Sequence, residues 1–145
     1  MKIPKKTKYR KYYKINIEKI EIKKTKLNYG QFGIKAQTNG YLRLGQMERI
    51  KLDIMKKLKH KSNIFFNFNP IFGLTEKGAA RMGSGKGDIC DWYMPVKKGR
   101  ILIEFSQCKV PKEEIKKIIK YSAVKWPILI SFTEVKQNFY EKLKW

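Results

Sequence analysis

The chain has 145 residues, a length suited to one compact domain with a tail, and its 42% hydrophobic residues suffice for one modest core. Its 34 lysines and arginines against 12 acidic residues give a net charge of +22, which calls for a polyanionic partner to offset self-repulsion. Two cysteines and one histidine exclude a disulfide-rich secreted scaffold and a four-ligand zinc site within the chain.

The partner is best sought among nucleic acids. Basic residues recur along the whole chain, which favours nucleic acid over an anionic membrane or an acidic protein. No apolar run approaches the roughly 20 residues of a membrane span. Cys90 and Cys108 are expected to be buried, inert thiols, and His60 is expected to be solvated or near phosphate.

Residues 1–26 predict a basic tail with eleven lysines and arginines and two glutamates. Tyr9, Tyr12 and Tyr13 alternate with basic residues, so that lysine can neutralise phosphate while tyrosine stacks on a base or packs on a ribose. We expect the tail to be disordered in free solution and to become ordered on RNA. The isoleucines between residues 15 and 22 predict a short strand in this segment.

Residues 27–133 predict a globular α+β domain. Alternation over residues 28–36 indicates a strand, and residues 64–68, ended by Pro70, indicate another. Between them, residues 45–60 predict a helix, because apolar residues recur there at spacings of three and four. The apolar stripe of this helix consists of Met47, Ile50, Ile54 and Leu58.

Residues 69–88 predict a long loop with little material for a core, and a loop of this length is usually functional or disordered. Alternation over residues 89–96, a tight turn at Lys97–Gly99 and a returning strand over residues 101–105 then predict a hairpin. One face of its first strand would carry Cys90, Trp92, Met94 and Val96.

A second helix is predicted to start at Pro111, where proline fits the first turn, and to end before Pro127. A last strand follows over residues 128–132, and residues 134–145 form a basic extension. The apolar stripe of this second helix consists of Ile115, Ile118, Ile119 and Ser122.

The sharpest motif is the glycine-rich segment Ala80-Arg81-Met82-Gly83-Ser84-Gly85-Lys86-Gly87. Alternate glycines permit positive φ, Arg81 offers a planar fork to phosphate or a guanine edge, and Lys86 offers a point charge. A nucleotide-binding P-loop needs glycine six residues before its lysine and a hydroxyl residue after it, where this chain has Ala80 and Gly87. The alternative interpretation of this segment is a flexible turn without a ligand.

Ordered segments along nearly the whole chain resemble one family. The segments that carry the resemblance are Pro4–Lys11, Tyr29–Ala36, Thr75–Lys77 with Arg81–Gly87, Gly87–Tyr93 with Gly99–Phe105, and Val110–Pro127. In this order and spacing the chain resembles the large-subunit ribosomal protein family called L-sixteen in bacteria and organelles and L-ten-e in archaea and the eukaryotic cytosol.

The resemblance implies an α+β fold of hammerhead type, with a mixed sheet, two main helices and a basic N-terminal tail. It implies a structural, non-enzymatic constituent of the large ribosomal subunit that binds rRNA near the aminoacyl-tRNA site and helps to position tRNA. Large-subunit rRNA, tRNA and neighbouring ribosomal proteins would be the partners, with no membrane insertion and no homo-oligomer. No cofactor and no metal ligand are expected, and structural Mg²⁺ would enter only through rRNA.

By position in the motifs, the tail and the glycine loop would carry most of the RNA-binding side chains. The expected rRNA- and tRNA-binding residues are Lys5, Lys6, Lys8, Tyr9, Arg10, Lys11, Lys35, Lys77, Arg81, Met82, Gly83, Ser84, Gly85, Lys86 and Gly87.

The chain departs from the family pattern at two places. Residues 15–26 replace a stretch that is usually richer in glycine and arginine, and the extension after Thr133 is longer than in compact bacterial members. Lysine, isoleucine and asparagine are frequent, and only five of the basic residues are arginine, which is typical of an AT-rich genome. These features favour a mitochondrial ribosome, with a plastid or a bacterial cytoplasm as the alternatives.

Two other functions are compatible with the residues. An RNA-processing enzyme or nuclease would draw its carboxylates from Glu76, Asp88, Asp91 or Glu104, although in so basic a chain each is more often the partner of a lysine. A free-standing RNA-binding chaperone would bind without a specific site and without a folded core, whereas the two helical stripes predict a core.

Overall fold

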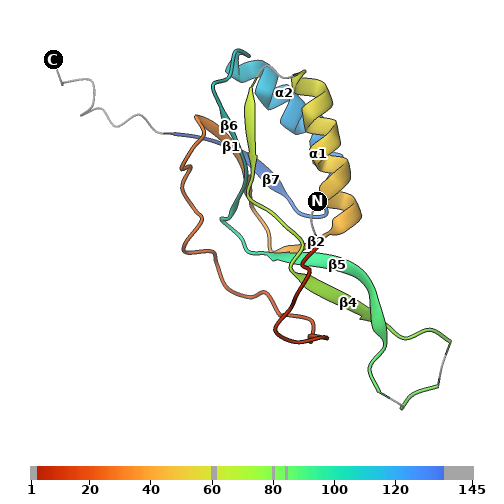
Figure 1. Ribbon diagram of the computed structural model, residues 1–145. Coiled ribbons are helices and arrows are strands. Elements are labelled where there is room, and N and C mark those ends of the chain that lie inside the picture. Colours follow the sequence, from red (N-terminus) through yellow and green to blue (C-terminus); the bar gives the residue numbers. More distant parts are fainter. Residues whose placement is uncertain (1–2, 60–61, 80, 84, 136–145) are drawn as a thin grey trace.

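Figure 1 shows the computed structural model of the protein, which describes residues 3–59, 62–79, 81–83 and 85–135. In chain order its elements are β1 (Phe32–Ala36), β2 (Gly40–Arg43), α1 (Leu44–Leu58), β3 (Asn63–Phe66), β4 (Phe72–Glu76), β5 (Asp88–Val96), β6 (Ile101–Ser106), α2 (Lys112–Ser122), the 3-10 helix η1 (Ala123–Lys125) and β7 (Ile130–Glu134).

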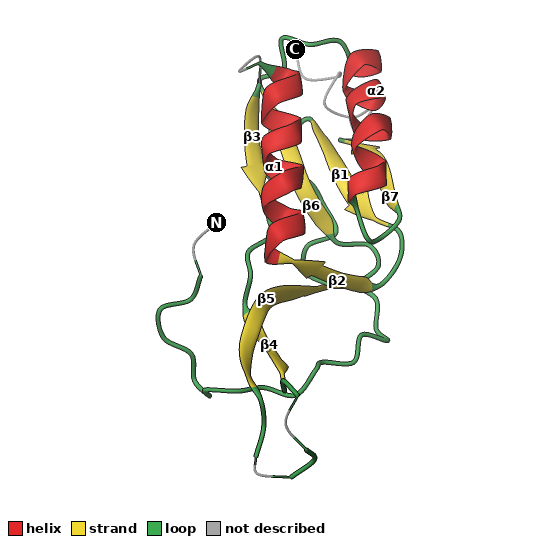
Figure 2. Cartoon of the chain, turned by 90° about the vertical axis from the view of Figure 1, so that its right-hand side faces the viewer, coloured by secondary structure: helices red, strands yellow, loops and turns green. Residues whose placement is uncertain are grey.

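The strands divide into two sheets, and every paired ladder is antiparallel. Sheet A has the order β3-β6-β1-β7, and sheet B has the order β2-β5-β4. Figure 2 shows α1 and α2 side by side against one face of sheet A, with sheet B beyond the start of α1. The α+β class with two main helices is confirmed, and the division into two antiparallel sheets is a detail that the strand pattern did not predict.

Both helices bury the stripes that the sequence predicted. The α1 helix begins where the Arg43 N–H donates to the Gln46 side chain at 3.0 Å, and it ends at Lys59, whose φ of 44° is left-handed. The α2 helix begins after Pro111, and the Ser122 hydroxyl at its end donates to the Ile119 carbonyl. All eight stripe residues are buried, and the seven apolar ones belong to the hydrophobic core that the helices share with both sheets. Each buried aliphatic side chain among them stabilises the fold by about 1.5–3 kcal/mol.

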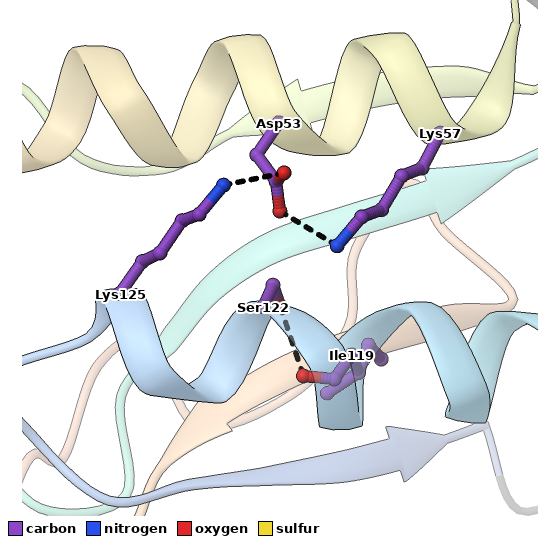
Figure 3. A network of polar contacts seen from close by, with 5 residues as sticks. All are labelled: Asp53, Lys57, Ile119, Ser122 and Lys125. Carbon is purple, nitrogen blue, oxygen red and sulfur yellow. Dashed lines mark hydrogen bonds and ion pairs between the residues drawn. The ribbon is translucent and has the colours of Figure 1, made fainter.

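A polar link joins the two helical segments at their surface. Asp53 of α1 accepts hydrogen bonds from the ammonium groups of Lys57, at 3.0 Å, and of Lys125 in η1, at 2.5 Å (Figure 3). Partial burial alone raises the pKa of Asp53, but the hydrogen bonds from Lys125 and Lys57 outweigh it and hold this pKa below its ordinary value. The carboxylate therefore stays ionised and fixes the end of the α2–η1 segment on α1.

On the opposite face of sheet A, Glu104 of β6 closes the N-terminal segment onto the domain. Its side chain is only 1% exposed, and it accepts hydrogen bonds from the N–H groups of Asn28, Tyr29 and Gly30 at 3.0, 2.8 and 3.1 Å. The Asn67 amide donates a fourth at 2.6 Å. Burial alone raises the pKa of Glu104, but these hydrogen bonds outweigh it and lower the pKa below its ordinary value.

The predicted hairpin is wrong. The turn at Lys97–Gly99 exists, with Gly99 at a φ of 91° and the Arg100 N–H donating to the Lys97 carbonyl. However, β5 belongs to sheet B and β6 to sheet A, so this turn passes the chain between two sheets. Alternation of side chains indicates two strands, but it does not say which partner each strand will find.

Other sequence predictions need correction as well. The predicted loop over residues 69–88 contains β4, and β2 was missed because four residues give little alternation to read. The described residues between 15 and 22 form no strand. Cys90 is exposed, because β5 reaches the core only at its second half, where Met94 and Val96 are buried. Cys108, after β6, is half-buried against the core. His60 and residues 136–145 of the predicted extension lie outside the described residues.

Candidate nucleic-acid interface

The glycine loop projects from the end of sheet B, where residues 77–87 join β4 to β5 (Figures 1 and 2). Gly83 and Gly85 have φ values of 100° and 90°, which confirms that the motif uses the left-handed backbone that glycine favours. Arg81, Met82 and Lys86 are exposed on this loop. Ala80 and Ser84 of the motif lie outside the described residues.

The two arms of the loop meet at Gly87. A Cβ atom on Gly87 would collide with the backbone carbonyl of Glu76 and approach the Lys77 nitrogen to 2.7 Å, so no larger residue fits this neck without a backbone shift. Within the loop, the Lys77 ammonium donates a hydrogen bond to the Gly83 carbonyl. Lys77, one of the expected RNA-binding residues, therefore spans the loop from one arm to the other.

The basic tail is attached to the same loop. The Lys86 ammonium donates to the Tyr12 carbonyl at 2.5 Å and lies 4.4 Å from the centre of the Tyr13 ring. In return, the Lys11 ammonium donates to the Lys86 carbonyl at 2.7 Å and to the Asp88 carboxylate at 3.1 Å. The tail and the loop, more than 70 residues apart in the sequence, thus hold each other through reciprocal lysine contacts.

Electrostatics support this attachment at neutral pH. The hydrogen bond from Lys11 lowers the pKa of Asp88 below its ordinary value, and the charges of Lys11 and of Arg10 act in the same direction. Asp88 therefore stays ionised opposite Lys11. Because the Asp88 side chain is almost fully exposed to water, the pair sets the position of the tail more than it stabilises the fold.

Beyond residue 14 the tail crosses sheet B and reaches sheet A (Figure 1). The Tyr41 hydroxyl donates to the Ile15 carbonyl, and the Asn39 amide donates to the Ile17 carbonyl at 3.0 Å. Glu21 then pairs with Arg100 at 3.5 Å, on the segment between the two sheets. Residues 15–22 therefore form irregular backbone, held by hydrogen bonds from side chains of the domain, where the isoleucines predicted a short strand.

The expected RNA-binding residues that the structure describes lie in four places. Lys11, Lys77, Lys86 and Gly87 lie together at the root of the loop, and Arg81, Met82, Gly83 and Gly85 lie on its projecting part. Lys5, Lys6, Lys8, Tyr9 and Arg10 are exposed on the tail, where the Lys8 ammonium lies 5.2 Å from the Tyr9 ring centre. Lys35 is half-buried on β1 in sheet A, on a different part of the molecule from the loop.

Sequence reasoning missed the partners of these residues. Phe72 of β4 contacts the Tyr12 ring edge-on at 5.4 Å, and Asp88 holds Lys11. Both residues lie within residues 69–88, which the sequence predicts to be a loop. The signal available was the alternation of tyrosines with lysines in the tail, which marked residues 9–13 but not the surface on which they lie.

Comparison with known proteins identifies the family. A sequence model described as "Ribosomal protein L16p/L10e" matches residues 4–133. The chain belongs to this family. The match contains the tail, the glycine loop and both sheets, so the resemblance seen in separate segments extends over the whole described domain.

Individual relatives of the family cover the chain almost completely. "Large ribosomal subunit protein uL16m" of Dictyostelium discoideum is 51% identical over 98% of this chain and 99% of its own length. A protein named uL16c from Cyanidium caldarium is 35% identical over 89% of this chain, and uL16 of Petrotoga mobilis is 33% identical over 88%. These span 91% and 90% of their own lengths.

Family membership makes the protein a structural ribosomal protein and not an enzyme. Of the four carboxylates that a nuclease would use, only two stand opposite each other. Glu76 and Asp88 face each other across the β4–β5 ladder, whereas Asp91 accepts from the Trp92 N–H and Glu104 is buried in sheet A. Among the described residues, no three acidic, histidine or cysteine side chains gather as metal ligands. The helices described are also too short or too polar to cross a membrane.

Proposed function

We propose that the protein binds large-subunit rRNA through its tail and glycine loop, near the aminoacyl-tRNA site, and that the projecting loop helps to position tRNA. Membership of the large ribosomal subunit follows from the family, since relatives in it are named as large-subunit proteins. rRNA and neighbouring ribosomal proteins are therefore partners. The 51% identity to the uL16m relative assigns the chain to the mitochondrial ribosome, ahead of a plastid or a bacterium.

The observation that carries the rRNA part is the attachment of tail to loop. Lys86 contacts Tyr12 and Tyr13, and Lys11 contacts Lys86 and Asp88, so the two basic segments form one surface. Neutralising several neighbouring phosphates releases condensed counterions, and this release supplies most of the affinity of a basic surface for RNA. Tyr9 and Tyr13 are exposed on that surface, where their rings are accessible to a base or a ribose.

The tRNA part rests on the shape and chemistry of the loop. Its left-handed glycines leave the backbone open to close approach by a ligand, and Arg81 presents a planar fork that suits phosphate or a guanine edge. Because the loop projects from the end of sheet B, it can reach a second RNA while the tail remains on the first. The protein needs no cofactor for this role, and Mg²⁺ acts through the folded rRNA.

Sedimentation of organelle lysate in a Mg²⁺-containing gradient, with mass spectrometry for this chain, tests the assignment to the subunit. We expect the protein to travel with the large subunit and the whole ribosome and to resist a moderate salt wash. If it stays at the top of the gradient while intact large subunits contain another member of the family, the proposal is wrong.

Chemical probing of rRNA in purified large subunits tests the proposed binding of rRNA near the aminoacyl-tRNA site. Subunits that carry the protein are compared with subunits depleted of it. They are also compared with subunits reconstituted with a chain that lacks its first 14 residues. We expect protection of rRNA near the aminoacyl-tRNA site, and part of it should require the tail. Protection confined to a distant part of the subunit would contradict the proposed position.

A further inference from the structure

A small pocket lies on the face of sheet B over which the tail passes. Its volume is about 90 Å³, and it is lined by Lys14, Tyr41, Arg43, Leu74 and Tyr93. None of these residues belongs to the expected RNA-binding set. Arg43 of β2 stands opposite Tyr93 of β5 in the ladder, and Tyr41 stands two residues before Arg43, so all three side chains share one face of the sheet.

The aromatic walls of this pocket are held in place. The rings of Tyr41 and Tyr93 meet edge-to-face with centres 5.6 Å apart, and Phe72 packs beside Tyr93 at 6.0 Å. The Tyr41 hydroxyl donates to the Ile15 carbonyl, which ties the ring to the tail. The pocket therefore exists before any ligand arrives.

Two cationic side chains line a pocket that has no acidic lining residue. The Lys14 ammonium lies 4.7 Å from the centre of the Tyr41 ring, and Arg43, the last residue of β2, is exposed at the start of α1. Both side chains are exposed, so their charges are accessible to a ligand that arrives from solvent. The lining thus favours an anion over a cation or an apolar group.

Volume limits the size of that anion. At roughly 30 Å³ for each water molecule in the liquid, the pocket holds about three waters. This space suits a group with a few oxygen atoms and is too small to enclose a nucleobase with its sugar. The guanidinium fork of Arg43 can donate two parallel hydrogen bonds to phosphate oxygens, and Lys14 can complete the neutralisation.

We propose that this pocket binds a single phosphate group of an RNA backbone, held between Lys14 and Arg43. The inference rests on the proposed rRNA-binding function and extends it from the tail and loop to sheet B. The face of sheet B then becomes a third RNA contact beside the tail and the loop. Tyr12 connects this face to the loop, because its ring contacts Phe72 of β4 and its carbonyl accepts from Lys86.

The test uses the full chain, labelled with ¹⁵N, and two probes: a single-stranded RNA decamer and inorganic phosphate at constant ionic strength. The Arg43 side-chain N–H signal is followed by NMR and assigned from the Arg43→Gln variant. We expect the decamer to shift this signal with saturation, and inorganic phosphate to shift it in the same direction at higher concentration. A shift with RNA alone also supports the proposal and assigns the site to nucleic acid.

A double-mutant cycle separates one shared phosphate from two independent contacts. Lys14→Gln and Arg43→Gln should each weaken decamer binding about tenfold, because each removes a charged hydrogen bond to phosphate. The double variant should weaken it little further, because both side chains hold one group. In the double variant, the negative slope of log affinity against log salt concentration should also become shallower by about 0.7, as expected for the loss of one phosphate contact. Arg49→Gln, on the exposed side of α1, is the matched control and should change affinity less than twofold.

The outcomes distinguish this inference from the proposed function. If the chain binds RNA but the Arg43 signal stays still, or the losses in the cycle are fully additive, the phosphate site is wrong and the proposed function stands. If inorganic phosphate shifts the Arg43 signal but the chain has no affinity for RNA, the pocket stands as an anion site and its assignment to an RNA backbone fails. Both variants alter exposed side chains, and equal melting temperatures will show that the fold is intact.

Discussion

The ammonium group of Lys86 donates a hydrogen bond to the backbone carbonyl of Tyr12, 74 residues earlier in the chain. A residue expected to face RNA is therefore also engaged with the protein's own tail. Any RNA phosphate that binds Lys86 must either share it with Tyr12 or displace the tail. The position of the tail and the binding of RNA to the loop are consequently coupled.

Lys86→Met should loosen the tail without unfolding the domain. The substitution removes the hydrogen bond to Tyr12 and the contact with the Tyr13 ring, and both residues lie outside the core. Limited chymotrypsin digestion should then cleave after the tail tyrosines several-fold faster, at an unchanged melting temperature. Lys120→Met, an exposed change on α2, serves as the control. Equal cleavage rates in all three proteins would refute the link between loop and tail.

Arg81→Ala should impair the accommodation of tRNA more than it affects folding. The side chain is exposed on the projecting loop, so its removal opens no cavity and the free energy of unfolding should change by less than about 0.5 kcal/mol. Ribosomes that carry the variant should accept aminoacyl-tRNA more slowly in a stopped-flow assay. Arg81→Lys keeps the charge but not the fork, and it should restore only part of the rate. Full activity of both variants would count against a role for this residue.

Glu104→Gln should destabilise the domain by about 3 kcal/mol. The three backbone N–H groups donate to one oxygen of the buried carboxylate and the Asn67 amide donates to the other, whereas the amide of glutamine has only one acceptor oxygen and no charge. Urea unfolding measures the loss, and Glu76→Gln, an exposed change, should lie within about 0.5 kcal/mol of the unaltered protein. A loss as small as that of the control would show that the carboxylate does not hold the N-terminal segment.

The same glutamate predicts a dependence of stability on pH. Because the pKa of Glu104 is lower in the folded chain than its ordinary value, its contribution is complete above that ordinary value. The contribution is lost as the pH falls through the lowered, folded pKa. The difference in unfolding free energy between the unaltered protein and Glu104→Gln should therefore shrink from pH 7 towards strongly acidic pH. A difference that does not change with pH would exclude this mechanism.

Asp53→Asn should weaken the attachment of the α2–η1 segment to α1 by about 1 kcal/mol. The aspartate is 13% exposed, but Lys57 and Lys125 are more exposed, so solvent screens much of the attraction. Lys57→Met and Lys125→Met, combined with Asp53→Asn, measure the two pair energies in urea unfolding, with Lys56→Met as the control. Pair energies of zero would show that the two lysines do not stabilise the attachment of the α2–η1 segment to α1.

The helices were predictable from the sequence because their burial is local in origin. Met47, Ile50, Ile54 and Leu58 face one side at helical spacing whatever the rest of the chain does, and all four are buried. The turn at Gly99 was predictable because glycine is the residue that most readily adopts the positive φ found there, and this preference is also local. Pairing of strands was not, because a strand such as β5 carries the same alternation whether it returns on β6 or pairs with β2 and β4.

The candidate site shows the same division. The glycine loop and the lysine-rich tail stand out as motifs, and positive φ at Gly83 and Gly85 follows from their chemistry. The contact of Lys11 with Asp88 did not follow, since it joins residues 77 apart that no pattern connects. Cys90 was expected inside because cysteine is usually buried, but the outer half of β5 projects beyond the core.

Gly87 has a consequence for how this protein can vary. Its backbone passes so close to Glu76 and Lys77 that the two arms of the loop are joined at their base before the residues of the tip begin. A change in the number of residues between 78 and 86 would therefore alter the reach of the tip without changing the register of β4 on β5. The contact to RNA and the fold of the domain can thus evolve separately, with one glycine as the boundary between them.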